Sequence, residues 1–150
     1  MPGPAWTLRP ATPADLPFLL ALRLATMAGH FERQGIAQSE DEHRLRVERR
    51  FDAACVVVCD GTDAGLLKLV REAPTWTLEQ IQLLPAYQGR GLGRAILAAV
   101  IAEARAAAMP LQLGVLKANP ARRLYERLGF AVSAESATGF TMTLGERPVG

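Results

Sequence analysis

The stretch Leu83-Leu84-Pro85-Ala86-Tyr87-Gln88-Gly89-Arg90-Gly91-Leu92-Gly93-Arg94 joins an apolar, strand-like segment to a helix-like one through three closely spaced glycines. Glycine lets the backbone turn tightly and lets a ligand approach its amides. A helix that begins here presents free N–H groups and a partial positive charge, which favour a phosphate. Two common phosphate motifs do not fit. Arg94 replaces the last glycine of G-x-G-x-x-G, and the chain has no Gly-Lys pair for a P-loop.

Strands and helices are predicted on both sides of this turn. Apolar and β-branched runs predict strands over 5–10, 53–60, 64–72, 75–84, 111–118, 130–135 and 140–144. Helical spacing and capping residues predict helices from 12 to 29, from 39, over 92–108 and from 119, with a loop over 30–38. Ser39 and Glu42 form a capping box at the start of the second helix, whose arginines are interpreted as a solvated face: Arg44, Arg46, Arg49 and Arg50. The third helix has a predicted apolar stripe: Ile96, Leu97, Val100, Ile101 and Ala104. The strand–helix–strand unit at 75–117 requires parallel strands. We therefore expect a mixed-sheet α+β or α/β fold of about seven strands and four helices, in one domain over 1–150.

Composition excludes several classes of protein. The chain has 150 residues, a formal net charge of +2 and 49% hydrophobic residues, which is ordinary for a globular domain. This charge does not indicate nucleic-acid binding. No apolar run approaches the roughly 20 residues that span a bilayer, and the N-terminus lacks the pattern of a signal peptide. We expect a cytoplasmic protein with no membrane or nucleic-acid partner.

No metal site is expected. Cys55 and Cys59 lie four residues apart on one predicted strand, where they point to the same face and do not readily form a disulfide. A zinc ion needs two further ligands, and His30 and His43 show no ligand spacing. Core packing is the favoured interpretation of both cysteines.

Two motifs together resemble the GNAT superfamily of acetyl-CoA-dependent N-acyltransferases. Residues 88–93 are similar to its Q/R-x-x-G-x-G/A signature. Residues 119–130 resemble its N-x-x-A-x-x-L-Y-x-x-x-G-F segment, with the alanine one place early. The order of strands and helices also fits this superfamily across nearly the whole chain.

The resemblance implies a binding site for acetyl-CoA. The turn residues Gln88, Gly89, Arg90, Gly91, Leu92, Gly93 and Arg94 would hold its pyrophosphate. Main-chain groups of Leu83 and Leu84 would pair with the pantetheine arm, which fills a gap between splayed strands 4 and 5. Asn119 would lie beside that arm, although its residue type also suits a helix cap.

Two residues are candidates for proton transfer. Tyr125 matches the family tyrosine near the sulfur and is the expected general acid; its alternative role is a core aromatic. Glu79 is the candidate base, since Thr77, Glu79, Ile81 and Leu83 alternate onto one strand face, with structural or exposed roles as alternatives. Gln80 and Gln82 face the other way and are weaker candidates. An amine such as lysine, with a pKa of about 10.4, needs a route for its proton before it can attack.

The predicted activity is direct transfer of acetyl from acetyl-CoA to a primary amine of a small or amino-acid-like molecule. Two alternatives stay open: acetylation of a protein or peptide amine, and a non-catalytic acyl-CoA sensor. No nucleophile motif indicates a covalent intermediate. The acceptor's identity and the length of the acyl group are not readable, and a homodimer is expected only from the resemblance.

Overall fold

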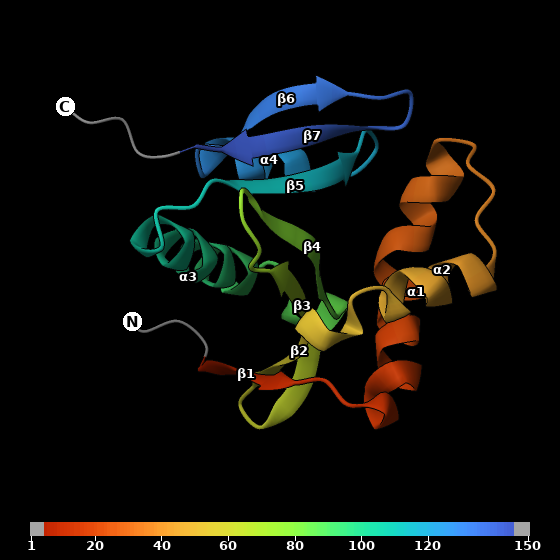
Figure 1. Cartoon of the computed structure of the whole chain (residues 1–150). Helices are drawn as coiled ribbons and strands as arrows, with labels where there is room; N and C mark the ends of the chain where they lie inside the picture. The colour runs from red at the N-terminus through yellow and green to blue at the C-terminus, as the bar shows by residue number, and fades with distance from the viewer. Residues whose placement is uncertain (1–4, 146–150) are drawn as a thin grey trace.

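The computed structural model describes residues 5–145, where seven strands form one mixed sheet with helices on both faces (Figure 1). The strands are β1 (Trp6–Pro10), β2 (Ala54–Cys59), β3 (Thr62–Val70), β4 (Trp76–Leu83), β5 (Leu111–Leu116), β6 (Ala131–Glu135) and β7 (Gly139–Leu144). The α-helices are α1 (Leu16–Arg33), α2 (Glu40–Glu48), α3 (Leu92–Ala106) and α4 (Ala121–Arg127). Short 3-10 turns cover Pro13–Asp15, Phe51–Ala53 and Pro85–Tyr87. The strand order is β1-β2-β3-β4-β5-β7-β6. This confirms the predicted fold class.

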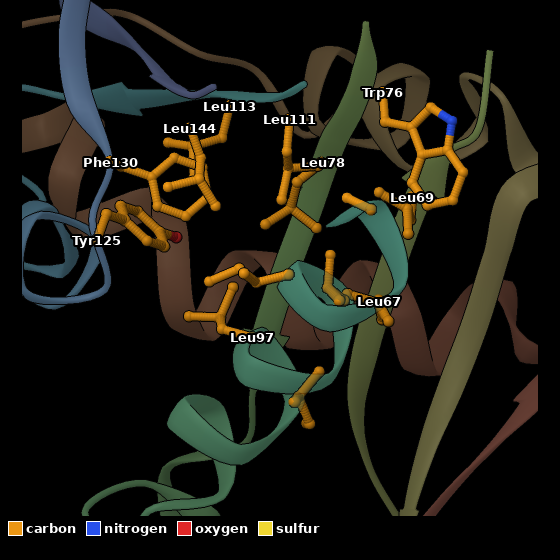
Figure 2. Close-up of a cluster of buried hydrophobic side chains, with 14 of the residues drawn as sticks. Leu67, Leu69, Trp76, Leu78, Leu97, Leu111, Leu113, Tyr125, Phe130 and Leu144 are labelled. Carbon is orange, nitrogen blue, oxygen red and sulfur yellow. The ribbon is translucent and has the colours of Figure 1, made fainter. Parts of the chain in front are cut away.

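The larger core lies between the sheet and the helices α3 and α4 (Figure 2). The predicted apolar stripe of α3 is buried there in full: Ile96, Leu97, Val100, Ile101 and Ala104. Facing side chains come from β3, β4, β5 and β7, so this helix holds together strands that are distant in sequence. Burial of a single large aliphatic side chain stabilises by roughly 1.5–3 kcal/mol.

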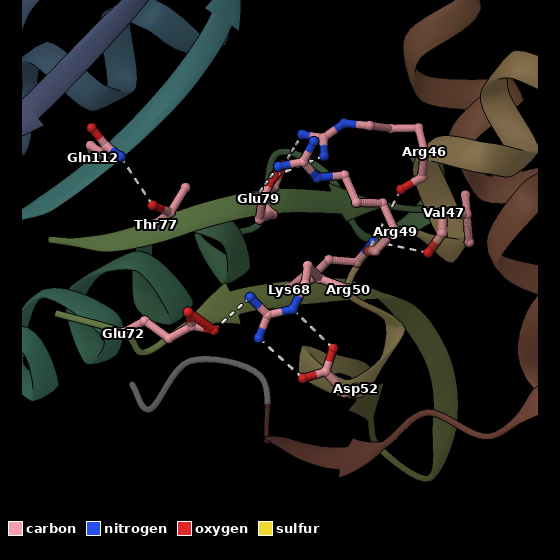
Figure 3. Close-up of polar contacts among 10 residues, drawn as sticks. All are labelled: Arg46, Val47, Arg49, Arg50, Asp52, Lys68, Glu72, Thr77, Glu79 and Gln112. Atoms are coloured by element: carbon pink, nitrogen blue, oxygen red, sulfur yellow. Dashed lines mark hydrogen bonds and ion pairs between the residues drawn. The ribbon is translucent and has the colours of Figure 1, made fainter.

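The second core lies between α1, α2 and the opposite face of the sheet. Its helix α2 begins with the predicted capping box: the Glu42 amide donates to Ser39 Oγ at 3.1 Å, and the Ser39 amide donates to Glu42 Oε1 at 3.2 Å. The other end of α2 lies over Lys68 of β3, which is fully buried (Figure 3). The Lys68 Nζ donates to the carbonyls of Arg46, Val47 and Arg49 at 3.1, 2.8 and 2.5 Å. This lysine therefore fixes the C-terminus of α2 against the sheet.

The strands β4 and β5 are parallel, as predicted, but pair over a short distance. Only Trp76–Leu78 pairs with Leu111–Leu113. The next residue, Glu79, has no partner on β3 either, since Leu78 pairs with Leu69 and Gln80 with Lys68. Glu79 is therefore a β-bulge, which bends a strand and increases its twist. β4 leaves β5 at the bulge, and the predicted splay is confirmed.

Four sequence predictions are wrong in detail. Helix α1 continues past Gly29 to Arg33, where we expected a loop. The bulge breaks the simple alternation of β4, so Ile81 packs on the α3 side of the sheet while Glu79 contacts α2. The expected solvated face of α2 also carries Arg46, which binds Glu79 instead. Cys59 is buried as expected, but Cys55 is only half-buried.

Among residues 5–145, the helices are each too short or too polar to cross a membrane.

Replacing Lys68 by methionine tests the anchoring of α2. The change leaves three carbonyls without their ammonium donor, and unsatisfied buried acceptors cost about 1–3 kcal/mol of unfolding free energy. We expect a loss of that size in urea unfolding. Lys117→Met is the matched control: Lys117 forms an exposed ion pair with Glu135, whose loss costs about 0–1 kcal/mol. Equal losses in the two variants would contradict the anchoring role.

Candidate active site

Two cavities meet where β4 and β5 separate. The turn-side cavity, of about 470 Å³, is lined by α1, the end of β4, the glycine turn with the start of α3, and α4. The hairpin-side cavity, of about 410 Å³, is lined by α1, Arg46 of α2, β4, β5 and the β6–β7 hairpin. Five residues line both cavities: Met27, Ile81, Gln82, Asn119 and Tyr125. The two spaces are therefore neighbouring parts of one site.

The glycine turn leaves amides free at the start of α3. Gly89 and Gly91 have φ of 74° and 78°, a left-handed conformation that favours glycine. A Cβ atom at either position would meet nothing within 4 Å, so open space lies above the turn. No side chain caps α3, whose first intrahelical donor here is Ala95, bonded to the Gly91 carbonyl at 3.0 Å. The N-terminal amides that precede Ala95 are thus available to an anion.

The end of β4 presents main-chain groups to the gap. The Leu84 amide donates to the Ala64 carbonyl of β3 at 2.9 Å, so it is engaged and not free for a ligand. Main-chain direction alternates along a strand, which turns Leu83 and Ile81 towards the gap instead. The Leu83 carbonyl accepts a hydrogen bond from Gln88 Nε2 at 2.9 Å. Gln88 thereby links the glycine turn to the strand.

Asn119 and Tyr125 lie between the two cavities. Asn119 Oδ1 accepts from the Ala121 amide at 3.0 Å, so the expected capping contact is present at the start of α4. Tyr125 is 7% exposed, and its ring packs edge-on against Phe130 at 6.0 Å between centroids. Its hydroxyl forms no hydrogen bond with another of the described residues. Burial raises the pKa of Tyr125 to about 12, which keeps the phenol protonated throughout the neutral range.

Glu79 lines the hairpin-side cavity and is held by two arginines (Figure 3). Arg46 Nη1 contacts Glu79 Oε2 at 2.8 Å, and Arg46 Nη2 donates to the Glu79 carbonyl at 2.7 Å. Arg49 lies 3.7 Å from the other carboxylate oxygen. Arg46 therefore stabilises both the charge and the exposed main chain of the bulge. The carboxylate is 13% exposed, so it retains access to the cavity.

The site also contains one charged residue that was not predicted from the sequence, and two glutamines that were predicted as weaker candidates. Arg23 lines the hairpin-side cavity and is 4% exposed. A signal was present, because Arg23 shares the buried helical spacing of Leu19 and Leu22. Gln80 and Gln82, judged weaker than Glu79, are buried on the same cavity, and Gln80 Nε2, Gln80 Oε1 and Gln82 Oε1 have no partner.

The part of the chain that the structure describes contains no group of three or more His, Cys, Asp or Glu side chains arranged to hold a metal ion.

A family model matches more than half of this chain. The model for the acetyltransferase (GNAT) domain matches residues 51–132, which is more than half of the chain. This chain belongs to the GNAT acetyltransferase family. The match includes the bulge, the glycine turn and Tyr125. A comparison with curated protein sequences found no match.

Solved structures of GNAT proteins share this fold over nearly its whole length. The PaiA N-acetyltransferase of Thermoplasma acidophilum, in complex with coenzyme A, is 17% identical, with a TM-score of 0.72 over 95% of this chain and 99% of that one. The ribosomal-protein-S18-alanine N-acetyltransferase of Escherichia coli is 23% identical, with a TM-score of 0.72 over 97% of each chain. An acetyltransferase of Thermus thermophilus is also 23% identical, with a TM-score of 0.72 over 93% of this chain and 96% of that one. At this identity the likeness establishes the fold alone.

The raised pKa of Tyr125 predicts a late phenol titration. The chain has two tyrosines, so Tyr87→Phe leaves Tyr125 as the only phenol. We expect its ultraviolet phenolate signal to have a midpoint near pH 12. A folded-state pKa above the unfolded value of about 10 also means that stability is lost as pH rises from 10 towards 12. A midpoint near pH 10 with circular dichroism still native would contradict the dry environment of Tyr125.

Proposed function

We propose that this protein is an N-acetyltransferase that moves an acetyl group from acetyl-CoA directly to a primary amine of a small molecule. One observation carries the proposal: two cavities of different composition meet at Tyr125 and Asn119, where β4 parts from β5. A two-substrate transfer needs such a junction, because both reacting groups must reach one point.

Acetyl-CoA fits the turn-side cavity on chemical grounds. The free amides over 88–94 suit its pyrophosphate, and the exposed Arg90 and Arg94 add positive charge beside them. The edge of β4 that faces away from β3 offers the main-chain groups of Ile81 and the amide of Leu83 to the pantetheine arm, since the Leu84 amide and the Leu83 carbonyl are already engaged. Asn119 and Tyr125 then border the thioester end. When bound, acetyl-CoA supplies an activated acetyl group on a thiolate that leaves.

Tyr125 and Glu79 are assigned the proton transfers. A phenol that stays protonated at neutral pH, next to a cavity, can donate to the departing sulfur. Glu79 is assigned to the acceptor side, where it receives the proton of the amine through water in the hairpin-side cavity. Its contact with Arg46 occupies one carboxylate oxygen at 2.8 Å, while Arg49 is more distant at 3.7 Å.

The mouth of the hairpin-side cavity favours a small acceptor. Gln34, which follows α1, donates through Nε2 to the Thr138 carbonyl of the β6–β7 hairpin at 2.8 Å. Its Oε1 accepts from the Ala118 amide at 2.6 Å. These bonds tie α1 to the hairpin, whose Thr138 lines the cavity, and to the segment before α4, so they restrict the room for a long peptide beside that wall. A protein acceptor, as in the S18-alanine N-acetyltransferase, is the alternative, and it requires these bonds to open.

Binding of acetyl-CoA is the first test. A ligand at about 100 times its dissociation constant stabilises a protein by roughly 2.7 kcal/mol, so acetyl-CoA should raise the melting temperature where NADH and ATP do not. Gly91→Ala strains the turn and places a methyl group in the open space above it, and we expect the shift to disappear. Gly61→Ala is the matched control, with φ of 79° and equally open space at the β2–β3 turn. An acetyl-CoA shift absent from wild type, or retained in Gly91→Ala, would contradict the binding site.

The acid role of Tyr125 predicts a defect in turnover. Tyr125→Phe keeps the ring and its packing, and we expect kcat to fall about 100-fold with KM for acetyl-CoA unchanged, in line with general-acid contributions. The defect should shrink with an acetyl thioester of a more acidic thiol, since that leaving group needs less protonation. Full turnover in Tyr125→Phe would remove the role.

The base role of Glu79 predicts a change in the pH–rate profile. Glu79→Gln keeps the size and an oxygen for Arg46, but cannot take a proton. We expect a fall of about 100-fold at neutral pH and loss of the acidic limb of the kcat/KM profile. Glu135→Gln is the control, because Glu135 lines the same cavity but pairs with Lys117 at 2.9 Å. An unchanged profile in Glu79→Gln would assign the proton route to another group.

A further inference from the structure

Arg23 is a buried cation without a carboxylate partner. It lies on the inner face of α1, is 4% exposed and lines the hairpin-side cavity. Its Nε donates to His43 Nδ1 at 3.0 Å, and its guanidinium lies 5.7 Å from the centre of the Phe31 ring. Within residues 5–145, no Asp or Glu forms an ion pair with it. Charged side chains are almost never buried without such a partner, so the charge of Arg23 at this wall of the cavity is left without a counter-anion.

The surrounding charges do not supply that anion. Glu79 is shared by Arg46 and Arg49, and Glu135, at the rim, pairs with Lys117. The ammonium of Lys68, on β3, adds a further positive charge close to Arg23 and Arg46. Burial, and then the neighbouring Arg46, lower the pKa of Arg23 to about 10, which still leaves it charged at neutral pH. The inner half of the cavity is therefore positive.

Gln80 provides a second polar group on the same wall. Its side chain is 3% exposed, and neither its amide nitrogen nor its oxygen has a partner. The Gln82 oxygen, on a residue that is 8% exposed, is also unpartnered. Both residues line the hairpin-side cavity. Buried amides are nearly always hydrogen-bonded, so groups left open beside a cavity indicate the position of a polar ligand.

We propose that the acceptor amine carries a carboxylate, which the Arg23 guanidinium and the Gln80 amide bind at the inner wall of the hairpin-side cavity. The proposal rests on the function given above and names the substrate class of that same site. A planar monoanion suits one guanidinium, whose parallel N–H groups match two carboxylate oxygens. Gln80 Nε2 adds a donor. The cavity of about 410 Å³ holds an amino-acid-sized molecule, and Tyr125 and Asn119 also line it.

His43 acts as a positioning residue for this contact. Its ring packs edge-on against Phe31 at 5.3 Å between centroids, and its Nδ1 accepts from Arg23. Burial, and then the charge of Arg23, lower the pKa of His43, which keeps Nδ1 free to accept. The Arg23 Nε is thus held, while its terminal nitrogens remain for the ligand.

Matched acceptors test the proposal on the full chain. The assay measures release of CoA from acetyl-CoA with three related amines: an α-amino acid, its carboxamide and its decarboxylated amine. Phenylalanine, phenylalaninamide and phenethylamine form one such series, and further series carry other side chains. We expect the acids to exceed their amides in kcat/KM by at least about tenfold in some series, and the preference to vanish in Arg23→Gln. Arg44→Gln is the control, since Arg44 faces Asp41 and Glu40 on the outer side of α2.

A second variant guards against misfolding. Gln80→Leu removes two unpartnered buried atoms, so we expect a higher melting temperature together with a weaker preference for acids.

The proposal is overturned if amides are used as well as acids, or if Arg23→Gln keeps the preference while it folds. It is also overturned if acetyl-CoA binds but no acid is acetylated or stabilises the CoA-loaded protein more than its amide. An absent acetyl-CoA shift would instead contradict the proposed function. In that case acids that still raise the melting temperature only when Arg23 is present would support the anion site.

Discussion

The bulge at Glu79 is the feature on which the rest of the site depends. Parallel pairing of β4 with β5 ends at Leu78, and the inserted residue follows directly. A bulge leaves main-chain groups unpaired, which is costly unless another donor or acceptor replaces the lost partner. Arg46 supplies that donor to the Glu79 carbonyl at 2.7 Å. Because Lys68 fixes the end of the helix that carries Arg46, a buried lysine in β3 supports the gap between two other strands.

Regular patterns make most of the fold predictable from the sequence. The stripe of α3 and the capping box of α2 each repeat a known spacing, and both are present in the structure. The glycine turn is predictable because only glycine readily adopts the positive φ of Gly89 and Gly91. Each of these features depends on residues that are close together in the sequence, so a short sequence pattern is enough to predict it.

The remaining parts depend on contacts between distant segments. No spacing in β4 indicates an extra residue at Glu79, so simple alternation wrongly places Glu79 on the same face as Ile81 and Leu83. The sequence predicts an end of α1 at Gly29, but tertiary contacts beyond it, including those of Gln34, outweigh the weak cost of glycine in a helix. The sequence alone suggests that Arg46 is solvated, because its partner, Glu79, lies 33 positions away.

The two cavities differ in the charge of the side chains that line them. On the turn side, the groups that face the gap are neutral at neutral pH, namely main-chain amides and a phenol whose pKa burial raises. In the proposed reaction, a thioester and a departing thiolate require donors there, not a fixed negative charge. On the hairpin side, Arg23 and the pair Arg46–Glu79 set a charged environment around unpartnered amides. Buried charges and open amides cost stability, and a protein that retains them beside a cavity gains most when a polar ligand completes their bonds. The pattern of unmet hydrogen bonds is therefore a better guide to the acceptor than the overall charge of the chain.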